Sequence, residues 1–318
     1  DTGAPIESDR VLPPGTANPT PGTGIFRSEP KGGNDGDGFL NNVAYDEASD
    51  TFFADGLGFD GDQPEGVAYA RATPGTLNGF ALYEAPATFP DSVTGTSIDQ
   101  FEHRALYGVS ASGETEFAIV RTGNYVEYGF GGFVYQRNGA VVLPAEGQGT
   151  YGGDYAAIRD FKGRGGLEYA EGDIEIDIDF SGFRNNCAAA ECDNAVRGYV
   201  RNRRIYATDG TDLTQDYLDA LTEQQGVAYT QLPVLQFEIG PDVMDANGEI
   251  VGDVGSSIVD DQGRADMYEE GKYYAVLAGD HTQLPGGEIV GVIVHESTVP
   301  EQTGVTARET GGFIAVRR

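Results

Sequence analysis

The stretch Gly172–Phe180 reads Gly-Asp-Ile-Glu-Ile-Asp-Ile-Asp-Phe and alternates acidic and apolar residues without a break. Successive side chains of a β-strand point to opposite faces, so Ile174, Ile176, Ile178 and Phe180 share one face. The other face carries only carboxylates. The pattern therefore predicts a strand with one side in a core and the other side in water.

Further short apolar segments surround this strand from residue 146 to the end of the chain. Gly-rich turns separate them at a spacing typical of β-sandwiches and barrels. One helix is predicted over Gln215–Gln225, where Tyr217 and Leu221 recur at helical spacing and Thr214 is the expected N-cap. The strand candidates predict an antiparallel barrel of about eight strands over residues 146–318.

Residues 39–145 contain short β segments as well, among them Glu116–Thr122 and Gly131–Arg137. Asn138-Gly139 follows the second of these and is typical of a two-residue hairpin turn. We predict a small antiparallel N-terminal sheet domain here. The expected fold class is thus all-β with one short helix.

Residues 1–38 are rich in Pro and Gly, which predicts an extended arm or tether that packs on its own domain or on a neighbouring subunit. The chain opens at Asp1 without Met or an apolar leader, which indicates a processed chain. No stretch approaches the ~18 apolar residues of a transmembrane helix. We expect any membrane contact to come from a lipid anchor outside this sequence.

The charge excludes one large class of partners. Against 20 Lys and Arg stand 51 Asp and Glu, a net charge of −31. Nucleic-acid binding is excluded because phosphates are neutralised by Lys and Arg. Carboxylates keep a protein hydrated in salt, so a saline extracellular medium fits the composition. With 39% hydrophobic residues the chain has enough apolar material for a core, unlike a disordered acidic polymer.

The two cysteines, Cys187 and Cys192, lie close together in a polar stretch. No histidine is near them, and two thiolates alone make a poor zinc site. A local disulfide is favoured over free thiols, which also indicates an oxidising compartment.

Two acidic turns are candidate calcium sites. Asp35 and Asp37, and likewise Asp60 and Asp62, stand on alternate positions of Gly-rich loops. This spacing lets oxygens converge on a hard cation, although neither stretch matches a full EF-hand loop. The alternative is that Asp-Gly simply forms turns.

Ligand-binding candidates come from the histidines and aromatic residues. His281 lies in an expected loop and is the best single candidate for a metal or haem ligand, whereas His103 is expected at a strand edge or surface. Tyr125, Tyr128 and Phe130 form a dense aromatic stretch that suits a planar or protein ligand. Core packing is the alternative for these rings.

Catalytic motifs are missing from the sequence. It contains no Gly-x-Ser-x-Gly and no His-Glu-x-x-His. Paired carboxylates are so frequent that they indicate no glycosidase chemistry by themselves. We therefore predict that the chain is not an enzyme.

Three Gly-rich stretches carry a resemblance to a known family: Gly149–Tyr155, Gly163–Tyr169 and Ala307–Phe313. With the alternating strand they resemble the barrel of bacterial transferrin-binding-protein-like surface lipoproteins. The resemblance implies export, a lipidated N-terminal Cys, display on the outer membrane of a Gram-negative bacterium, and a handle domain that grips an iron-carrier protein or haem. No anchoring Cys stands at the start of the printed sequence, and we expect it just before Asp1. The chain is also shorter than the two-lobed members.

The leading hypothesis is thus a surface lipoprotein-like binding protein that captures a protein or small iron-containing ligand without catalysis. A self-assembling secreted subunit of a filament or surface layer is the first alternative, with the arm of residues 1–38 packed on a neighbour in a homo-oligomer. A secreted glycan-active enzyme is the second. It requires a cleft with two carboxylates, one of them with a raised pKa.

Overall fold

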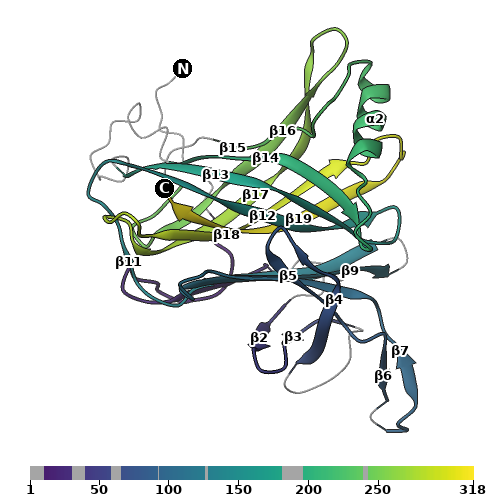
Figure 1. The fold of residues 1–318 in the computed structure, drawn as a ribbon, viewed down its shortest axis with the longest axis horizontal. Coiled ribbons are helices and arrows are strands. Elements are labelled where there is room, and N and C mark those ends of the chain that lie inside the picture. The colour runs from purple at the N-terminus through teal and green to yellow at the C-terminus, as the bar shows by residue number, and fades with distance from the viewer. Residues whose placement is uncertain are drawn as a thin grey trace.

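The computed structural model describes residues 11–30, 40–58, 66–91, 93–125, 128–180, 196–238 and 243–318. In these ranges the chain is all-β apart from one helix, α2 (Thr214–Gln225) (Figure 1). An open antiparallel sheet from the N-terminal part lies against a closed eight-stranded antiparallel barrel. The predicted fold class is therefore confirmed.

The barrel closes because β19 pairs with β12 as well as with β18. A short strand, β11 (Val141–Val142), precedes it and runs parallel to the end of β17. The barrel strands are β12 (Gln148–Lys162), β13 (Glu168–Asp179), β14 (Val196–Ala207), β15 (Leu235–Phe237), β16 (Glu249–Val259), β17 (Ala265–Asp280), β18 (Glu288–Thr298) and β19 (Thr306–Arg317).

The open sheet, here named the handle sheet, has the strand order β2-β3-β4-β5-β8-β9-β10-β1. Its strands are β1 (Ile25–Ser28), β2 (Asn42–Asp46), β3 (Thr51–Asp55), β4 (Val67–Leu77), β5 (Phe80–Glu84), β8 (His103–Val109), β9 (Thr115–Tyr125) and β10 (Tyr128–Arg137). A separate hairpin of β6 (Thr88–Pro90) and β7 (Ser97–Asp99), the finger, projects away from the barrel (Figure 1).

The alternating strand behaves as its sequence predicts. Ile174, Ile176 and Ile178 are each 1% exposed and Phe180 is 2% exposed inside the barrel. The acidic side chains of the same strand point outward. There Arg201 on β14 binds the carboxylate of Glu175 at 2.8 Å, so the outer charges of neighbouring strands compensate one another.

The handle sheet packs on the outer face of the barrel. Phe117 and Ile119 of β9 share one core with Ile158 of β12 and with Val290 and Val292 of β18. A third core covers the opposite face of the handle sheet, where the ring of Phe52 stacks on Tyr83. The molecule therefore has one core inside the barrel, one between barrel and handle sheet, and one beyond the handle sheet.

The Gly-Gly-Phe stretch of the last strand has a steric reason. A Cβ at Gly311 would lie 2.2 Å from the Tyr155 hydroxyl, and a Cβ at Gly312 would lie 2.1 Å from the Phe117 ring. Successive residues face opposite sides of a strand. The two glycines thus make room for a tyrosine inside the barrel and for a handle-sheet phenylalanine outside it.

Part of the predicted arm belongs to this fold. β1 pairs with β10, and Gly15 forms a bridge to Arg27. The Arg27 guanidinium binds the buried Glu249 carboxylate of the barrel at 2.7 and 2.9 Å. Residues 11–30 are therefore seated on their own chain.

The β4–β5 hairpin also fixes the handle sheet to the barrel. Asn78 and Gly79 both have positive φ angles, 44° and 85°, as a two-residue hairpin turn requires. The Asn78 amide donates to the carbonyl oxygens of Tyr155 at 3.1 Å and Gly172 at 2.9 Å. Gly172 lies where the register of β13 and β14 shifts, so this side chain satisfies a carbonyl beside a bulge.

The hairpin predicted at Asn138-Gly139 is wrong. β10 pairs with β9 and β1, while the residues after the turn leave the sheet as β11 and pair with β17. The Asn138 N–H donates to the Glu114 carbonyl at 2.7 Å. Tertiary partners thus replace the expected return strand.

The predicted N-cap of the helix is also wrong, although the helix itself is confirmed. The cap position is Leu213, and Thr214 is the first helical residue. The Thr214 hydroxyl oxygen instead accepts the Ile205 N–H at 3.0 Å and ties the helix to β14. No helix in the described ranges is long and apolar enough to cross a membrane.

Candidate functional site

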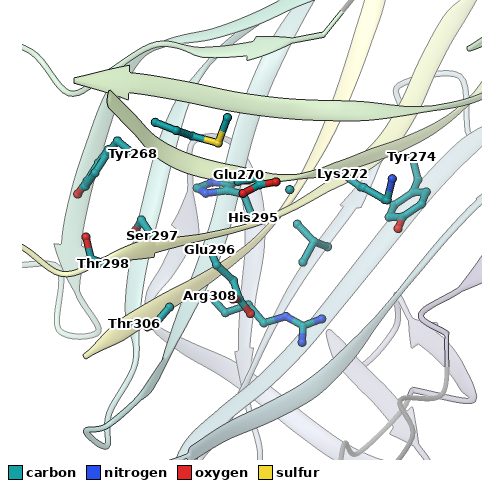
Figure 2. A pocket seen from close by; sticks show the side chains of 13 residues that line it. Tyr268, Glu270, Lys272, Tyr274, His295, Glu296, Ser297, Thr298, Thr306 and Arg308 are labelled. Carbon is teal, nitrogen blue, oxygen red and sulfur yellow. The ribbon is translucent and has the colours of Figure 1, made fainter. Parts of the chain in front are cut away.

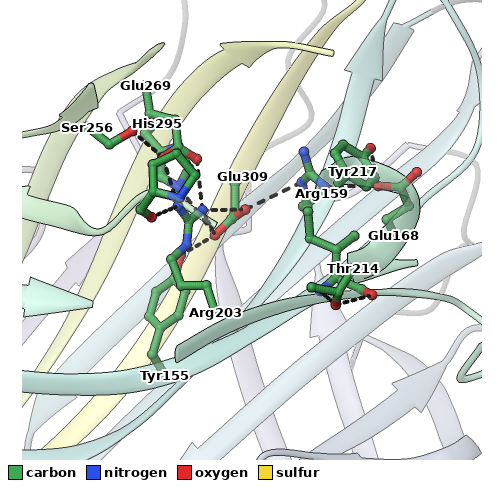
Figure 3. Close-up of polar contacts among 12 residues, drawn as sticks. Tyr155, Arg159, Glu168, Arg203, Thr214, Tyr217, Ser256, Glu269, His295 and Glu309 are labelled. Atoms are coloured by element: carbon green, nitrogen blue, oxygen red, sulfur yellow. Dashed lines mark hydrogen bonds and ion pairs between the residues drawn. The ribbon is translucent and has the colours of Figure 1, made fainter. Parts of the chain in front are cut away.

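A buried charged network occupies the barrel interior (Figure 3). The Arg203 guanidinium donates to both oxygens of Glu269 at 2.8 Å and lies 3.3 Å from Glu309. His295 Nε2 lies 3.2 Å from the Glu309 carboxylate, and the Tyr155 hydroxyl donates to it at 2.9 Å. All of these side chains point inward from different barrel strands.

A second arginine extends the network toward α2. Arg159 binds Glu168 at 3.0 Å and lies 3.4 Å from Glu309. Tyr217 of α2 donates its hydroxyl to Glu168 at 2.7 Å, and its ring lies 4.8 Å from the Arg159 guanidinium. The helix therefore contributes Tyr217 to the network, and Figure 3 shows this side chain beside Arg159 and Glu168.

The ionisation states follow from burial and neighbouring charge. Burial raises the pKa of the Glu309 carboxyl, but the charge of Arg203 lowers this pKa by more, so it lies below its usual range. The same balance, with Arg203 as the main cation, lowers the pKa of Glu269. Burial and Glu309 together raise the pKa of the Tyr155 hydroxyl.

These carboxylates are poor candidates for acid–base chemistry. A general acid at neutral pH needs a raised pKa, and both Glu269 and Glu309 have lowered ones. Each is paired with Arg203. The network thus neutralises charge inside the barrel. This network was not predicted from the sequence, in which its one signal is charged residues within apolar strand segments, such as Arg159 after Ala-Ala-Ile.

The structure brings two predicted aromatic residues together. The Tyr125 ring lies 6.2 Å from Phe130, and Phe101 lies 6.0 Å from Tyr125. Phe130 is 6% exposed and packs as a core residue, whereas Tyr125 is 47% exposed. The structure describes only the backbone of the third predicted residue, Tyr128, which lies in β10. We name Phe101, Tyr125 and Phe130 the aromatic cluster.

His103 lies under this cluster and is not at the surface, contrary to expectation. It is fully buried, with its ring 5.8 Å from that of Phe130. Burial lowers its pKa to about 4, and the hydrogen bond with the Phe101 carbonyl offsets only part of this. The side chain is therefore neutral at pH 7 and fills a core position.

His281 lies apart from the aromatic cluster, at the β17–β18 loop. Its Nδ1 is 2.5 Å from the Tyr151 hydroxyl and its Nε2 is 3.0 Å from the Ala278 carbonyl. Burial lowers its pKa to about 4. Both ring nitrogens thus have protein partners at the position predicted to hold a metal or haem.

The other predicted sites lie outside the described residues. They are the calcium candidates Asp35, Asp37, Asp60 and Asp62 and the disulfide candidates Cys187 and Cys192. Among the described residues no group of three or more His, Cys, Asp or Glu side chains is arranged to hold a metal ion.

A groove of about 650 Å³ lies over the outer face of β17, β18 and β19 (Figure 2). Glu270 stands opposite Glu296 across two strands, and Arg308 follows on the third. Lys272, the other lining cation, binds Asp253 at 2.7 Å. Because both signs of charge alternate along the groove, its lining favours no single class of ligand.

A smaller groove contains a pair of exposed carboxyl groups. Glu223 at the end of α2 and Glu301 in the β18–β19 loop line about 480 Å³. The hydrogen bond with Glu223 raises the pKa of Glu301, and the charge of Glu223 adds to this. Carboxyl groups in hydrogen-bond contact are closer than the ~5 Å between the two groups of a retaining glycosidase. The pair lacks the geometry expected for glycan hydrolysis.

Comparison with known proteins gives only distant matches. No family model matches the chain, and no curated protein does. Among similar solved structures is a double mutant of transferrin binding protein B from Haemophilus parasuis Hp5, with 10% identity and a TM-score of 0.36 over 88% of this chain and 45% of that chain.

Two further structures are similar. Intact Ap-TbpB, with N and C lobes, has 12% identity and a TM-score of 0.33 over 73% of this chain and 38% of that chain. A single mutant of the Haemophilus parasuis Hp5 protein has 10% identity and a TM-score of 0.29 over 86% and 65%. The chain thus spans less than two thirds of each. All three TM-scores are below 0.5, so these matches do not assign the chain to that family.

Proposed function

We propose that this chain is a non-catalytic binding protein, exported and held at the outer-membrane surface of a Gram-negative bacterium. It captures a protein ligand with the end of its handle sheet that carries the finger and the aromatic cluster. Residues 39–145 would form the ligand-binding domain and residues 146–318 the supporting barrel. The acidic composition and the resemblance to surface lipoproteins support the location.

The observation that carries the proposal is the set of exposed apolar side chains at this end. Tyr125 is 47% exposed in the aromatic cluster, and Ile98 of the finger is 46% exposed and pairs with Phe89. Val93 in the finger turn is 89% exposed. Protein interfaces are enriched in aromatic and apolar anchors, so a group of such side chains at one end of the molecule supports an interaction site there.

A protein ligand is favoured over a small iron-containing one. The finger is a protruding hairpin (Figure 1), whereas small ligands occupy concave sites that cover most of their surface. His281, the residue expected to hold haem, has both nitrogens engaged inside the protein. A projecting apolar hairpin suits contact with another protein surface.

The test uses the immobilised full chain to capture protein from the native medium. In a double variant, Ile98→Asp with Tyr125→Ala, we expect at least about tenfold weaker retention of the captured protein, because hot-spot residues contribute about 2 kcal/mol each. Retention of purified partner is measured by biolayer interferometry.

The matched control is Val259→Asp, which places the same charge on an exposed residue of the β16–β17 hairpin. The control should bind like the unmodified chain. Equal binding by the double variant, or equal loss in the control, would refute capture by the handle sheet.

A further inference from the structure

A groove of about 490 Å³ lies at the base of the finger, between β4, β5 and the start of β8. Its depth comes from small side chains that leave space above the backbone. Its apolar floor consists of Ala68, Ala70, Ala85, Pro86 and Ala87.

The wall of the groove contains one arginine and two carboxylates. Arg104 binds Glu102 at 2.7 Å and also pairs with Glu84. The Arg104 side chain is only 12% exposed, whereas Glu84 and Glu102 are 43% and 47% exposed. The groove therefore covers its cation and presents carboxylates to the solvent.

Counting charges gives one excess negative charge in the groove. Glu84 and Glu102 contribute −2 and Arg104 contributes +1, so the sum is −1. The other polar lining groups, Gln100 and Asn124, are uncharged amides. An anion would meet carboxylates here, and a wholly apolar group would desolvate them at a cost.

We propose that this groove binds a lysine or arginine side chain presented by the protein ligand, an inference that rests on the proposed function. The alkyl stem of such a side chain lies on apolar surface while its charged head remains at a polar rim. Here the Ala and Pro floor matches the stem, and Glu84 and Glu102 accept from the head.

The groove lies at the same end of the handle sheet as the aromatic cluster but on the other face, because Arg104 lines the groove whereas the preceding residue, His103, packs under the cluster. Asn124 of the groove precedes Tyr125, and Gln100 precedes Phe101 of the aromatic cluster. Ala87 and Gln100 of the groove directly flank the two strands of the finger, so a partner that contacts the finger can also place a cation in the groove. The net charge of −31 attracts a basic partner at long range, which raises the association rate.

The test titrates the isotope-labelled full chain with acetyl-arginine methylamide and follows backbone amide NMR signals. We expect saturable shifts at the groove residues. The neutral acetyl-glutamine methylamide should shift these signals at least about tenfold more weakly, as the loss of a charge-assisted hydrogen bond predicts. The double variant Glu84→Gln with Glu102→Gln should bind the arginine probe at least about tenfold more weakly.

The matched control, Glu270→Gln with Glu296→Gln, removes two carboxylates from the groove of Figure 2. It should bind the probe like the unmodified chain. Equal shifts with the neutral probe, unchanged affinity in the Glu84 and Glu102 variant, or displacement of the probe by millimolar calcium would overturn the inference.

The two proposals can fail separately. If the arginine probe does not bind while Ile98→Asp with Tyr125→Ala still abolishes protein capture, only the cation site is refuted. If the probe binds but protein capture is insensitive to that double variant, the handle sheet is not the capture surface and the groove remains a cation site.

Discussion

The barrel interior and the groove at the base of the finger each combine an arginine with two glutamates. In the barrel, Arg203, Glu269 and Glu309 are 3%, 5% and 2% exposed. In the groove, Arg104 is 12% exposed, whereas Glu84 and Glu102 remain nearly half exposed.

The difference lies in what water can reach. Buried carboxylates depend on their arginine, because an uncompensated charge in a protein interior is strongly unfavourable. Half-exposed carboxylates remain hydrated and keep an oxygen available to a ligand. Similar residues therefore stabilise the fold in one region and offer a recognition surface in the other.

The largest effect is expected from a substitution that breaks the buried cluster. Arg203→Ala leaves Glu269 and Glu309 without their main partner and should reduce the free energy of unfolding by about 3–5 kcal/mol. Arg104→Ala should cost only about 1 kcal/mol, since its partners reach water. Urea denaturation of both variants measures the two values, and equal losses would contradict the comparison.

Acid should act on the same cluster. The pKa values of Glu269 and Glu309 are lowered because Arg203 outweighs the opposing effect of burial. A carboxylate with a lowered folded-state pKa stabilises the protein above its unfolded-state pKa, and this is lost as pH falls through the folded-state value.

We therefore expect the free energy of unfolding to decrease as pH is lowered below about 5. In the Arg203→Ala variant, protonation removes the uncompensated charge of the two buried carboxyl groups. The difference in free energy of unfolding between the variant and the unmodified chain should therefore become smaller as the pH falls. Urea denaturation of both proteins across this pH range measures how that difference changes. A difference that stays constant with pH would show that Arg203 does not control the ionisation of Glu269 and Glu309.

A smaller effect is expected at the β4–β5 hairpin, which joins the handle sheet to the barrel. Asn78→Gly keeps the left-handed backbone but removes the hydrogen bonds to Tyr155 and Gly172, and should cost about 1–2 kcal/mol. Asn138→Gly is the control, since its amide bonds an exposed carbonyl, that of Gly113. Thermal unfolding compares the stability of the two variants. If Asn78→Gly is as stable as Asn138→Gly, the Asn78 side chain does not help to hold the handle sheet on the barrel.

The smallest effect is expected on the outer face of the barrel. Arg201 and Glu175 form a pair with side chains 49% and 28% exposed. Arg201→Ala should cost at most about 1 kcal/mol, and less at high salt, because solvent screens exposed pairs. Melting temperatures at two salt concentrations check this. A loss as large as that of Arg203→Ala would remove the distinction between buried and exposed pairs.

Arg203 shows why the sequence could not predict every charge of the buried network. Strict alternation from Val200 would turn Arg201 and Arg203 to the same outer face. In the structure both Arg201 and Asn202 are exposed, and Asn202 has a φ of 54°, so a bulge shifts the phase and turns Arg203 inward. Nothing in the run Arg-Asn-Arg-Arg marks this shift.

The candidate binding surface was predictable only in part. The aromatic residues Tyr125 and Phe130 stand out by composition, and the structure brings them together. Their neighbour Phe101 and the groove residues come from several separate strands and loops. The Asn-Gly signal at residues 138–139 gave a wrong hairpin because neighbouring segments, rather than a return strand, pair with those residues.

By itself the sequence determined the β-strand architecture, the single helix and the acidic exterior, because side-chain alternation and net charge are properties of the chain alone. The tertiary structure decided which charges are buried and which are presented, since bulges set strand phase and packing of distant strands sets solvent access. Arg203 inside the barrel and Arg104 beneath its carboxylates are the result.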